Sequence, residues 1–189
     1  DVLHLADQRA LDTFKGRFDE YRKLDDEILP LAVENTNLKA QRLSFGAAQE
    51  AADAFRGAVE MAARRAKPDC CSEATAHKAL VALLDIQVLQ APHIAESEDA
   101  AMTKLESRMK ESAATARAAA SDLNAAEAAA ALDRFLAIND EIVTLSRRNS
   151  NVRSLALALG RKRMVTAECE DGLRALEQAI AGHQFSATR

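Results

Sequence analysis

Apolar residues recur along residues 139–166 at alternating steps of three and four, which is the spacing of a coiled-coil seam. This spacing predicts one uninterrupted helix over the stretch, NDEIVTLSRRNSNVRSLALALGRKRMVT. Two of the seam positions, Asn149 and Arg163, carry strongly polar side chains. The full set of seam positions is Ile142, Leu145, Asn149, Val152, Ala156, Leu159, Arg163 and Thr166.

A second long stripe of apolar positions predicts a helix over residues 1–66. Pro30 lies inside it and is expected to kink the helix, because proline removes a hydrogen-bond donor and clashes with the preceding turn. Pro68, in the segment Lys67-Pro68-Asp69-Cys70-Cys71-Ser72, is expected to end it. The stripe includes Leu11, Phe14, Phe18, Tyr21, Leu24, Ile28, Leu31, Asn35, Leu38, Arg42, Phe45, Ala52, Phe55 and Val59.

Two shorter helices are expected between these long ones. The first ends before Pro92, and the second begins at Ser97 as the capping residue, with acidic residues in its first turn. Capping residues at 121–124 indicate one more break. The fold class is therefore all-α, an elongated antiparallel bundle of two long helices, about 1–66 and 124–182, and two short ones, about 73–90 and 97–121.

The two long helices resemble each other. Asn35-Thr36-Asn37-Leu38 matches Asn149-Ser150-Asn151-Val152, and Gly46 matches Gly160. Antiparallel pairing then places residues whose numbers sum to about 187 or 188 opposite each other. In this register Asn35 and Asn149 lie within about one turn of each other in height.

The same register places acidic residues opposite basic ones, which supports it. It sets residues 25–27 against residues 161–163, and Glu34 against Arg153. The short helices then cover only the far end of the long pair, down to about Gly46. We expect a single domain over residues 1–189, with a four-helix part at about 44–145 and a two-helix hairpin of residues 1–43 with 146–189.

Composition agrees with an all-α chain, since 189 residues contain only six glycines and three prolines. No apolar run reaches the roughly 20 residues that span a bilayer. The chain begins at Asp1 without a methionine, so we expect it to be part of a longer protein. The three cysteines suggest neither a disulfide framework nor a metal site, and Cys169 is expected to be a small buried apolar residue.

Little in the sequence points to catalysis. The four histidines, at positions 4, 77, 93 and 183, are scattered, and no glycine-rich phosphate loop is present. We therefore expect neither an enzyme, nor a cofactor, nor a bound metal. Residues 142–167 contain no Asp or Glu and form a basic block of Arg147, Arg148, Arg153, Arg161, Lys162 and Arg163. Nucleic acid is nevertheless not expected as a partner, because the net charge is −4 and acidic residues flank this block.

Four cations near the two Asn-x-Asn motifs have no obvious acidic partner in this register: Lys39, Arg42, Arg147 and Arg148. Of these, Arg42 lies about one turn from Glu141, which could pair with it. One hypothesis is a site for a small carboxylate between the long helices, because arginine binds carboxylates through two parallel hydrogen bonds. The alternative is structural, since an asparagine in a seam sets register and oligomeric state without any ligand. The candidate ligand-binding residues are Asn35, Lys39, Arg42, Arg148 and Asn149.

Two segments of the chain resemble a known family. Residues 11–55 contain FDEY and ILPLAVENTN, and residues 138–180 contain INDEI, LSRRNSNVRSLALALGRKRMVTAEC and LRALEQAI. Together they are similar to the extracytoplasmic sensor domain of bacterial methyl-accepting chemotaxis proteins, of the four-helix-bundle or helical bimodular type. The ligand-binding arginines and threonine of simpler family members have no matching positions here, so no ligand contact is carried over.

The resemblance implies a periplasmic domain of an inner-membrane protein, anchored by transmembrane segments outside this chain. It also implies a homodimer, a signalling module on the other side of the membrane, and a small-molecule ligand such as a carboxylate or an amino acid. The expected function is ligand sensing in chemotaxis, with signal transduction through the long helices. Two alternatives stay open, the sensor domain of a membrane histidine kinase and a ligand-free structural coiled-coil scaffold.

Overall fold

The computed structural model describes residues 2–66 and 70–187, with side chains for residues 8–66 and 71–181. Over these residues the chain is helical and contains no strand. Two long helical stretches and two shorter ones pack together, which confirms the predicted all-α bundle. The predicted helix stop at residues 67–69 lies outside the described residues.

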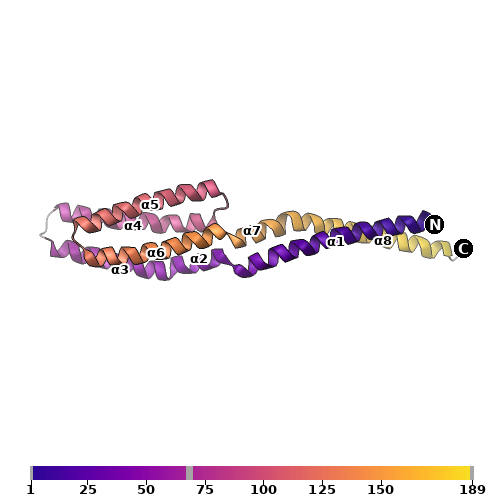
Figure 1. The fold of residues 1–189 in the computed structure, drawn as a ribbon, viewed down its shortest axis with the longest axis horizontal. Helices are drawn as coiled ribbons and strands as arrows, with labels where there is room; N and C mark the ends of the chain where they lie inside the picture. Colours follow the sequence, from indigo (N-terminus) through magenta and orange to yellow (C-terminus); the bar gives the residue numbers. More distant parts are fainter. Residues whose placement is uncertain (1, 67–69, 188–189) are drawn as a thin grey trace. The chain divides into compact units, whose positions relative to one another are not determined.

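Both long stretches are interrupted, so the prediction of one uninterrupted helix over residues 139–166 is wrong. The first stretch continues through Pro30 and breaks at Asn35 and Gly46, and the last one breaks at Asn149 and at a π-helical segment. The elements are α1 Val2–Glu34, α2 Thr36–Phe45, α3 Ala47–Arg65, α4 Cys70–Ala95, α5 Asp99–Asp122, α6 Ala126–Arg148, α7 Ser150–Leu157, η1 Ala158–Lys162 and α8 Arg163–Ala187 (Figure 1).

The packing divides the chain into two units. The first contains the residues up to Glu34 and those from Arg153, and the second contains residues 35–152. The sequence placed this division nearer 43/44 and 145/146. The second unit extends further because α4 reaches the level of Asn37, whose side-chain amide donates to the Ile94 carbonyl at 2.7 Å.

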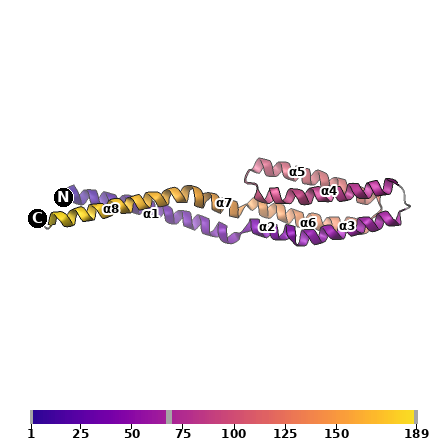
Figure 2. The same cartoon turned by 180° about the vertical axis from the view of Figure 1, so that it is seen from behind.

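Within the second unit, α4 packs along α5, and α6 packs along α2 and α3. Helix α6 also contacts α4 and α5, which closes the bundle. Figures 1 and 2 show α3, α4, α5 and α6 side by side from opposite directions. The helices therefore enclose one continuous core.

This core combines two buried aromatic side chains, several large aliphatic side chains and many alanines. Phe55 of α3 and Phe135 of α6 are both 0% exposed. Small neighbours let the helix axes approach closely, and Leu83, Ile86 and Leu132 are buried in the same cluster as the two rings. The buried alanines are Ala40, Ala48, Ala51, Ala52, Ala58, Ala76, Ala79, Ala82, Ala116, Ala119, Ala120, Ala125 and Ala128.

Helix α4 extends past the predicted end at residue 90. It passes through Pro92 and ends at Ala95. Pro92 is exposed, and so is Val88 one turn earlier (63%), so the carbonyl that loses its helical partner lies on a solvent-facing side. His93 lies about 100° further round the helix and is completely buried, which holds this last turn in the core.

The start of α5 also differs from the prediction. Its N-cap is Glu98, without a side-chain capping bond, and not Ser97. The Glu96 carboxylate instead accepts hydrogen bonds from the backbone N–H groups of Ser97 (2.8 Å) and Glu98 (2.9 Å). These two bonds lower the pKa of Glu96. The predicted break at residues 121–124 is confirmed, and Asn124 there has a φ of 51°.

In the first unit, α1 packs along α8 (Figures 1 and 2). Leu24 and Ile28 of α1 are buried against Val165 and Cys169 of α8. The prediction for Cys169 is confirmed, since it is 9% exposed, and burial raises the pKa of its thiol. Phe14, Phe18 and Tyr21 continue the stripe, with ring centroids 5.9 and 6.1 Å apart.

Ion pairs join the helices of this unit. Lys162 pairs with Asp25, as the predicted register requires, and its ammonium lies 4.7 Å from the centroid of the Tyr21 ring. Arg161 instead reaches Glu20 at 2.7 Å. Solvent screens charges this exposed, so these pairs favour the register more than they stabilise the fold.

The predicted seam positions Ile142 and Asn149 are buried, whereas the later positions Ala156, Leu159 and Arg163 are exposed, so the predicted seam is wrong there. Leu159 is 64% exposed, whereas Val165 is buried (4%). The break at Asn149 restarts the helix in a new phase. The π-helical segment then bonds residues five apart and not four, which turns the apolar face again. The predicted seam positions Ala156 and Arg163 are therefore exposed, and Ser154 and Cys169 are buried.

Candidate functional site

Asn35 and Asn149 interrupt the two long stretches in the same way. Asn35 has φ 55° and ψ 44°, and Asn149 has φ 52° and ψ 37°, so both adopt the left-handed conformation. Asparagine tolerates this conformation better than other residues with a side chain. Each break leaves the first backbone N–H groups of the next helix, α2 or α7, without helical acceptors.

Side chains of the other long helical stretch supply the missing hydrogen-bond acceptors. The backbone N–H of Thr36 donates to the Ser150 hydroxyl at 2.9 Å, and the backbone N–H of Ser150 donates to the Thr36 hydroxyl at 3.1 Å. The exposed fractions are 2% for Thr36 and 0% for Ser150. Each helix start is therefore capped by a side chain of the other helix.

The next residues repeat this exchange. The backbone N–H of Asn37 donates to Asn151 Oδ1 at 3.1 Å, and the backbone N–H of Asn151 donates to Asn37 Oδ1 at 3.2 Å. Asn37 Nδ2 then donates to Asn149 Oδ1, and Asn151 Nδ2 donates to Asn35 Oδ1. These bonds relate residues 35–37 to residues 149–151 by an approximate two-fold exchange. We call these six residues the double cap.

The double cap also holds the end of α4. Asn37 Nδ2 donates to the Ile94 carbonyl, and Asn149 Nδ2 donates to the Glu96 carbonyl at 2.9 Å. The asparagine side chains are therefore engaged with the protein itself. Their role in this structure is to cap helix ends at a break, which differs from the register-setting seam asparagine that the sequence offered as the alternative to ligand binding.

A second polar cluster lies in the core between α4, α5 and α6. His93 is 0% exposed, with Nδ1 at 2.6 Å from the Ser146 hydroxyl and Nε2 at 2.9 Å from Glu106 Oε1. Arg147 Nε donates to the same Glu106 oxygen at 2.6 Å. Arg147 and, after it, His93 hold the pKa of the Glu106 carboxyl below its usual range.

Arg147 is one of the four cations that had no partner in the sequence register, and here the structure corrects the sequence. It bonds Asp99 Oδ1 at 3.1 Å and Thr103 Oγ1 at 2.8 Å besides Glu106. All three partners come from α5. Pairing only the two long helices could not reveal them, because α5 had no place in that register.

A third polar chain crosses the core through two amides. The Ser44 hydroxyl donates to Gln90 Oε1 at 2.7 Å, and Gln90 Nε2 donates to Asn139 Oδ1 at 2.9 Å. Asn139 Nδ2 points to the Met109 sulfur at 3.8 Å. Gln90 is 1% exposed and Asn139 is 5% exposed. We call Ser44, Gln90 and Asn139 the amide chain.

The structure brings only part of the predicted ligand site together. Asn35 and Asn149 belong to one hydrogen-bond network, the double cap. Lys39 and Arg42 lie exposed on α2, and Arg148 lies exposed in the last turn of α6. A carboxylate site formed by these five residues stays a prediction.

Sequence reasoning missed His93, Gln90 and Asn139 as core residues. A signal was available in their spacing, because Gln90 and His93 are three apart and Asn139 and Ser146 are seven apart. Such spacings place polar residues on one face of a helix. They mark a polar layer only once α4 and α6 are known to pack face to face.

No described helix combines the length and apolarity needed to cross a membrane. Within the described parts of the chain, no three His, Cys, Asp or Glu side chains gather closely enough to hold a metal ion.

The fold and its polar core define the class of this protein, an all-α helical bundle whose long helices are broken and capped by each other. No family model matches the chain, and neither a curated protein nor a solved structure matches it.

Proposed function

We propose that this chain is the ligand-sensing domain of a bacterial chemoreceptor. In this proposal it binds a small molecule outside the cytoplasm and relays binding through its long helices to a transmembrane signalling module. The family resemblance of residues 11–55 and 138–180 and the all-α bundle both support it. A homodimer and membrane anchors outside the chain are parts of the same proposal.

The double cap is the observation that carries this function. A helix that only serves as a scaffold is most stable when its backbone hydrogen bonds are continuous, and both long stretches here give up that continuity at equivalent residues. Side-chain hydrogen bonds close the two breaks, each contributing about 0.5–1.5 kcal/mol. Small ligands supply coupling energies of about 1–3 kcal/mol, which is enough to shift an equilibrium between closed and opened forms of these breaks.

The first test is a thermal-shift screen of organic acids and amino acids against the purified chain. A compound that binds only the folded state should raise its stability by about 2.7 kcal/mol at a hundredfold excess over the dissociation constant. Arg42→Ala and Arg148→Ala report on the site predicted from the sequence. A hit that loses its effect in both variants places the ligand there, and a hit that keeps its effect places it elsewhere.

The second test is a hybrid receptor in which this chain replaces the sensor of a chemoreceptor with a measurable kinase output. A compound from the screen should change that output at the concentrations at which it stabilises the chain. If no compound in a broad library stabilises the chain and the hybrid stays silent, the sensing proposal fails and the scaffold alternative is favoured.

A further inference from the structure

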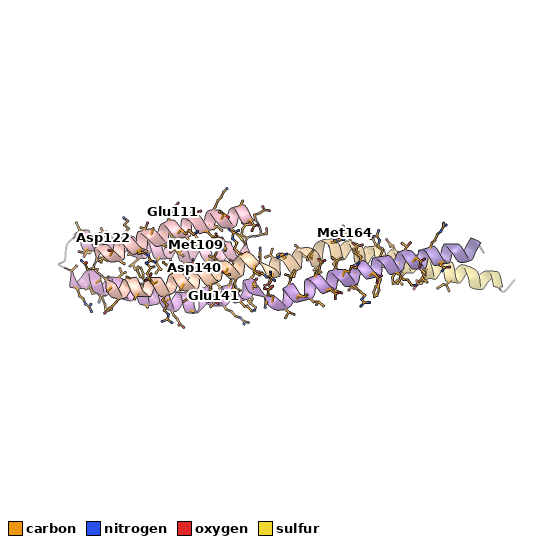
Figure 3. All side chains as sticks on the ribbon, in the orientation of Figure 1. Met109, Glu111, Asp122, Asp140, Glu141 and Met164 are labelled. Carbon is orange, nitrogen blue, oxygen red and sulfur yellow. The ribbon has the colours of Figure 1, made fainter. Side chains whose placement is uncertain are left out.

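A hollow of about 490 Å³ lies between α5 and α6, away from the double cap. This volume falls within the usual range of small-molecule sites, about 300–1,000 Å³. Figure 3 labels Met109 and Asp140, which lie on its two helices. The residues around it are Glu106, Met109, Lys110, Ala113, Arg117, Leu136, Asn139, Asp140, Val143 and Thr144.

A buried donor in this hollow lacks a strong acceptor. The Asn139 amide group carries two N–H bonds, and the partner of its nitrogen is the Met109 thioether at 3.8 Å, a weak acceptor. Its oxygen is already occupied by Gln90, so the NH₂ group cannot be turned away without breaking that bond. Asn139 is only 5% exposed, and an oxygen acceptor in the hollow would improve its hydrogen bonding.

The rim of the hollow carries both signs of charge, since the exposed carboxylate of Asp140 lines it together with the cations Lys110 and Arg117. Arg117 pairs with Asp133 at 2.7 Å, and Glu106 pairs with Arg147 and His93. Within the described part of the chain, no carboxylate pairs with the exposed Lys110. Its ammonium can therefore bind an anion without first breaking an ion pair.

Apolar side chains complete the lining. Met109 is 3% exposed, and Ala113, Leu136 and Val143 are partly buried beside it. These groups favour an apolar body over a fully polar one. The lining therefore fits a molecule with a hydrogen-bond acceptor at one end and an apolar chain at the other.

We propose that this hollow binds a small monocarboxylate with an apolar chain, whose carboxylate accepts hydrogen bonds from Asn139 Nδ2 and the Lys110 ammonium. The apolar chain packs on Met109, Leu136 and Val143. This inference rests on the proposed sensing function and names its ligand class and its site. It differs from the site predicted from the sequence, which is formed by other residues.

The amide chain gives the site a physical link to the first long stretch. A carboxylate on Asn139 Nδ2 polarises the Asn139 amide and strengthens the bond that its oxygen accepts from Gln90. Gln90 in turn accepts from Ser44, two residues before the break at Gly46. The ligand therefore acts through Gln90 on α2, although it touches only α5 and α6.

Isothermal titration calorimetry with hexanoate and its neutral isostere hexanamide tests the site on the purified chain. Hexanoate should bind, and hexanamide should bind roughly fivefold more weakly because it lacks the charge that Lys110 attracts. Lys110→Gln should weaken hexanoate to a similar degree without affecting hexanamide. Lys104→Gln is the matched control, because Lys104 is exposed on the same helix and does not line the hollow.

Met109→Leu provides a second variant that conserves volume and is expected to fold. It removes the thioether acceptor, so hexanoate affinity should stay equal or rise. Absence of binding, or binding that Lys110→Gln leaves unchanged, would overturn the site. If hexanoate binds as expected but the hybrid receptor is silent to it, the site stands and the sensing function fails. If the hybrid responds only to compounds that Lys110→Gln does not affect, the function stands and this site fails.

Discussion

Thr36 and Ser150 cap each other's helices across the bundle, with the two backbone N–H groups donating to the opposite hydroxyls at 2.9 and 3.1 Å. The two hydroxyl oxygens are themselves 3.2 Å apart, and Thr36 Oγ1 donates to Ser150 Oγ. Each residue is therefore both capped and capping, which makes the two helix starts depend on one another.

Ser150→Ala should lower the free energy of unfolding by about 1–3 kcal/mol, because it leaves the buried N–H of Thr36 without an acceptor. Thr36→Val should have a similar effect on Ser150. The double variant should cost less than the sum, with a coupling energy of about 0.5–3 kcal/mol, measured by urea denaturation. Ser121→Ala, at an exposed serine, serves as the control and should stay within about 0.5 kcal/mol of wild type. Strict additivity at positions 36 and 150 would contradict reciprocal capping.

Asn149→Gly should be more stable than Asn149→Ala by about 1 kcal/mol. Both variants lose the asparagine side chain, so their difference reports on the backbone alone. Glycine adopts the left-handed conformation without steric cost, whereas alanine pays about 1–2 kcal/mol for it. In a continuous helix the order reverses, because alanine is favoured over glycine by about 1 kcal/mol. Thermal unfolding monitored by circular dichroism at 222 nm shows which of the two variants is more stable. The same pair of substitutions at Asn35 should give the same order of stability.

Glu106 should make the fold sensitive to acid. Its pKa is lowered in the folded state, so the unfolded chain binds more protons and stability falls as pH falls. The stabilisation is complete above the ordinary glutamate pKa of about 4.3 and is lost as pH drops through the lower folded value.

Urea denaturation of wild type and Glu106→Gln between pH 7 and pH 3 measures this effect. The variant should show a flatter decline in stability below about pH 4.3. Glu111→Gln is the matched control on the same helix, because Glu111 is exposed. Parallel curves for wild type and Glu106→Gln would exclude the Arg147–Glu106–His93 cluster as a source of acid sensitivity.

Gly46→Ala and Gly57→Ala should change stability in opposite directions. A Cβ at position 46 would lie 3.0 Å from the backbone oxygen of Arg42, which cannot move without distorting α2. A Cβ at position 57, within α3, would meet nothing within 4 Å. Gly57→Ala should therefore stabilise the fold by about 0.4–1 kcal/mol. Gly46→Ala should lower the thermal midpoint, and an increase there would contradict the close approach.

The sequence by itself determined the helical class, the two long and two short stretches and the equivalence of residues 35–37 with residues 149–151. These features depend on the periodicity of apolar residues and on local residue chemistry, which can be read from a single stretch of sequence. The antiparallel register could also be predicted from the sequence, because opposite charges such as Asp25 and Lys162 face each other in this register.

Only the tertiary structure decided where the long helices break and which polar residues enter the core. An asparagine in a heptad seam is compatible both with a continuous helix and with a left-handed break. Which of the two forms depends on whether the other long helical stretch can cap the exposed N–H groups. His93, Glu106 and Arg147 come from three different helices, as do Ser44, Gln90 and Asn139. Their bonds cross between helices whose packing no single stretch of sequence specifies, so these polar clusters became visible only when the bundle was assembled.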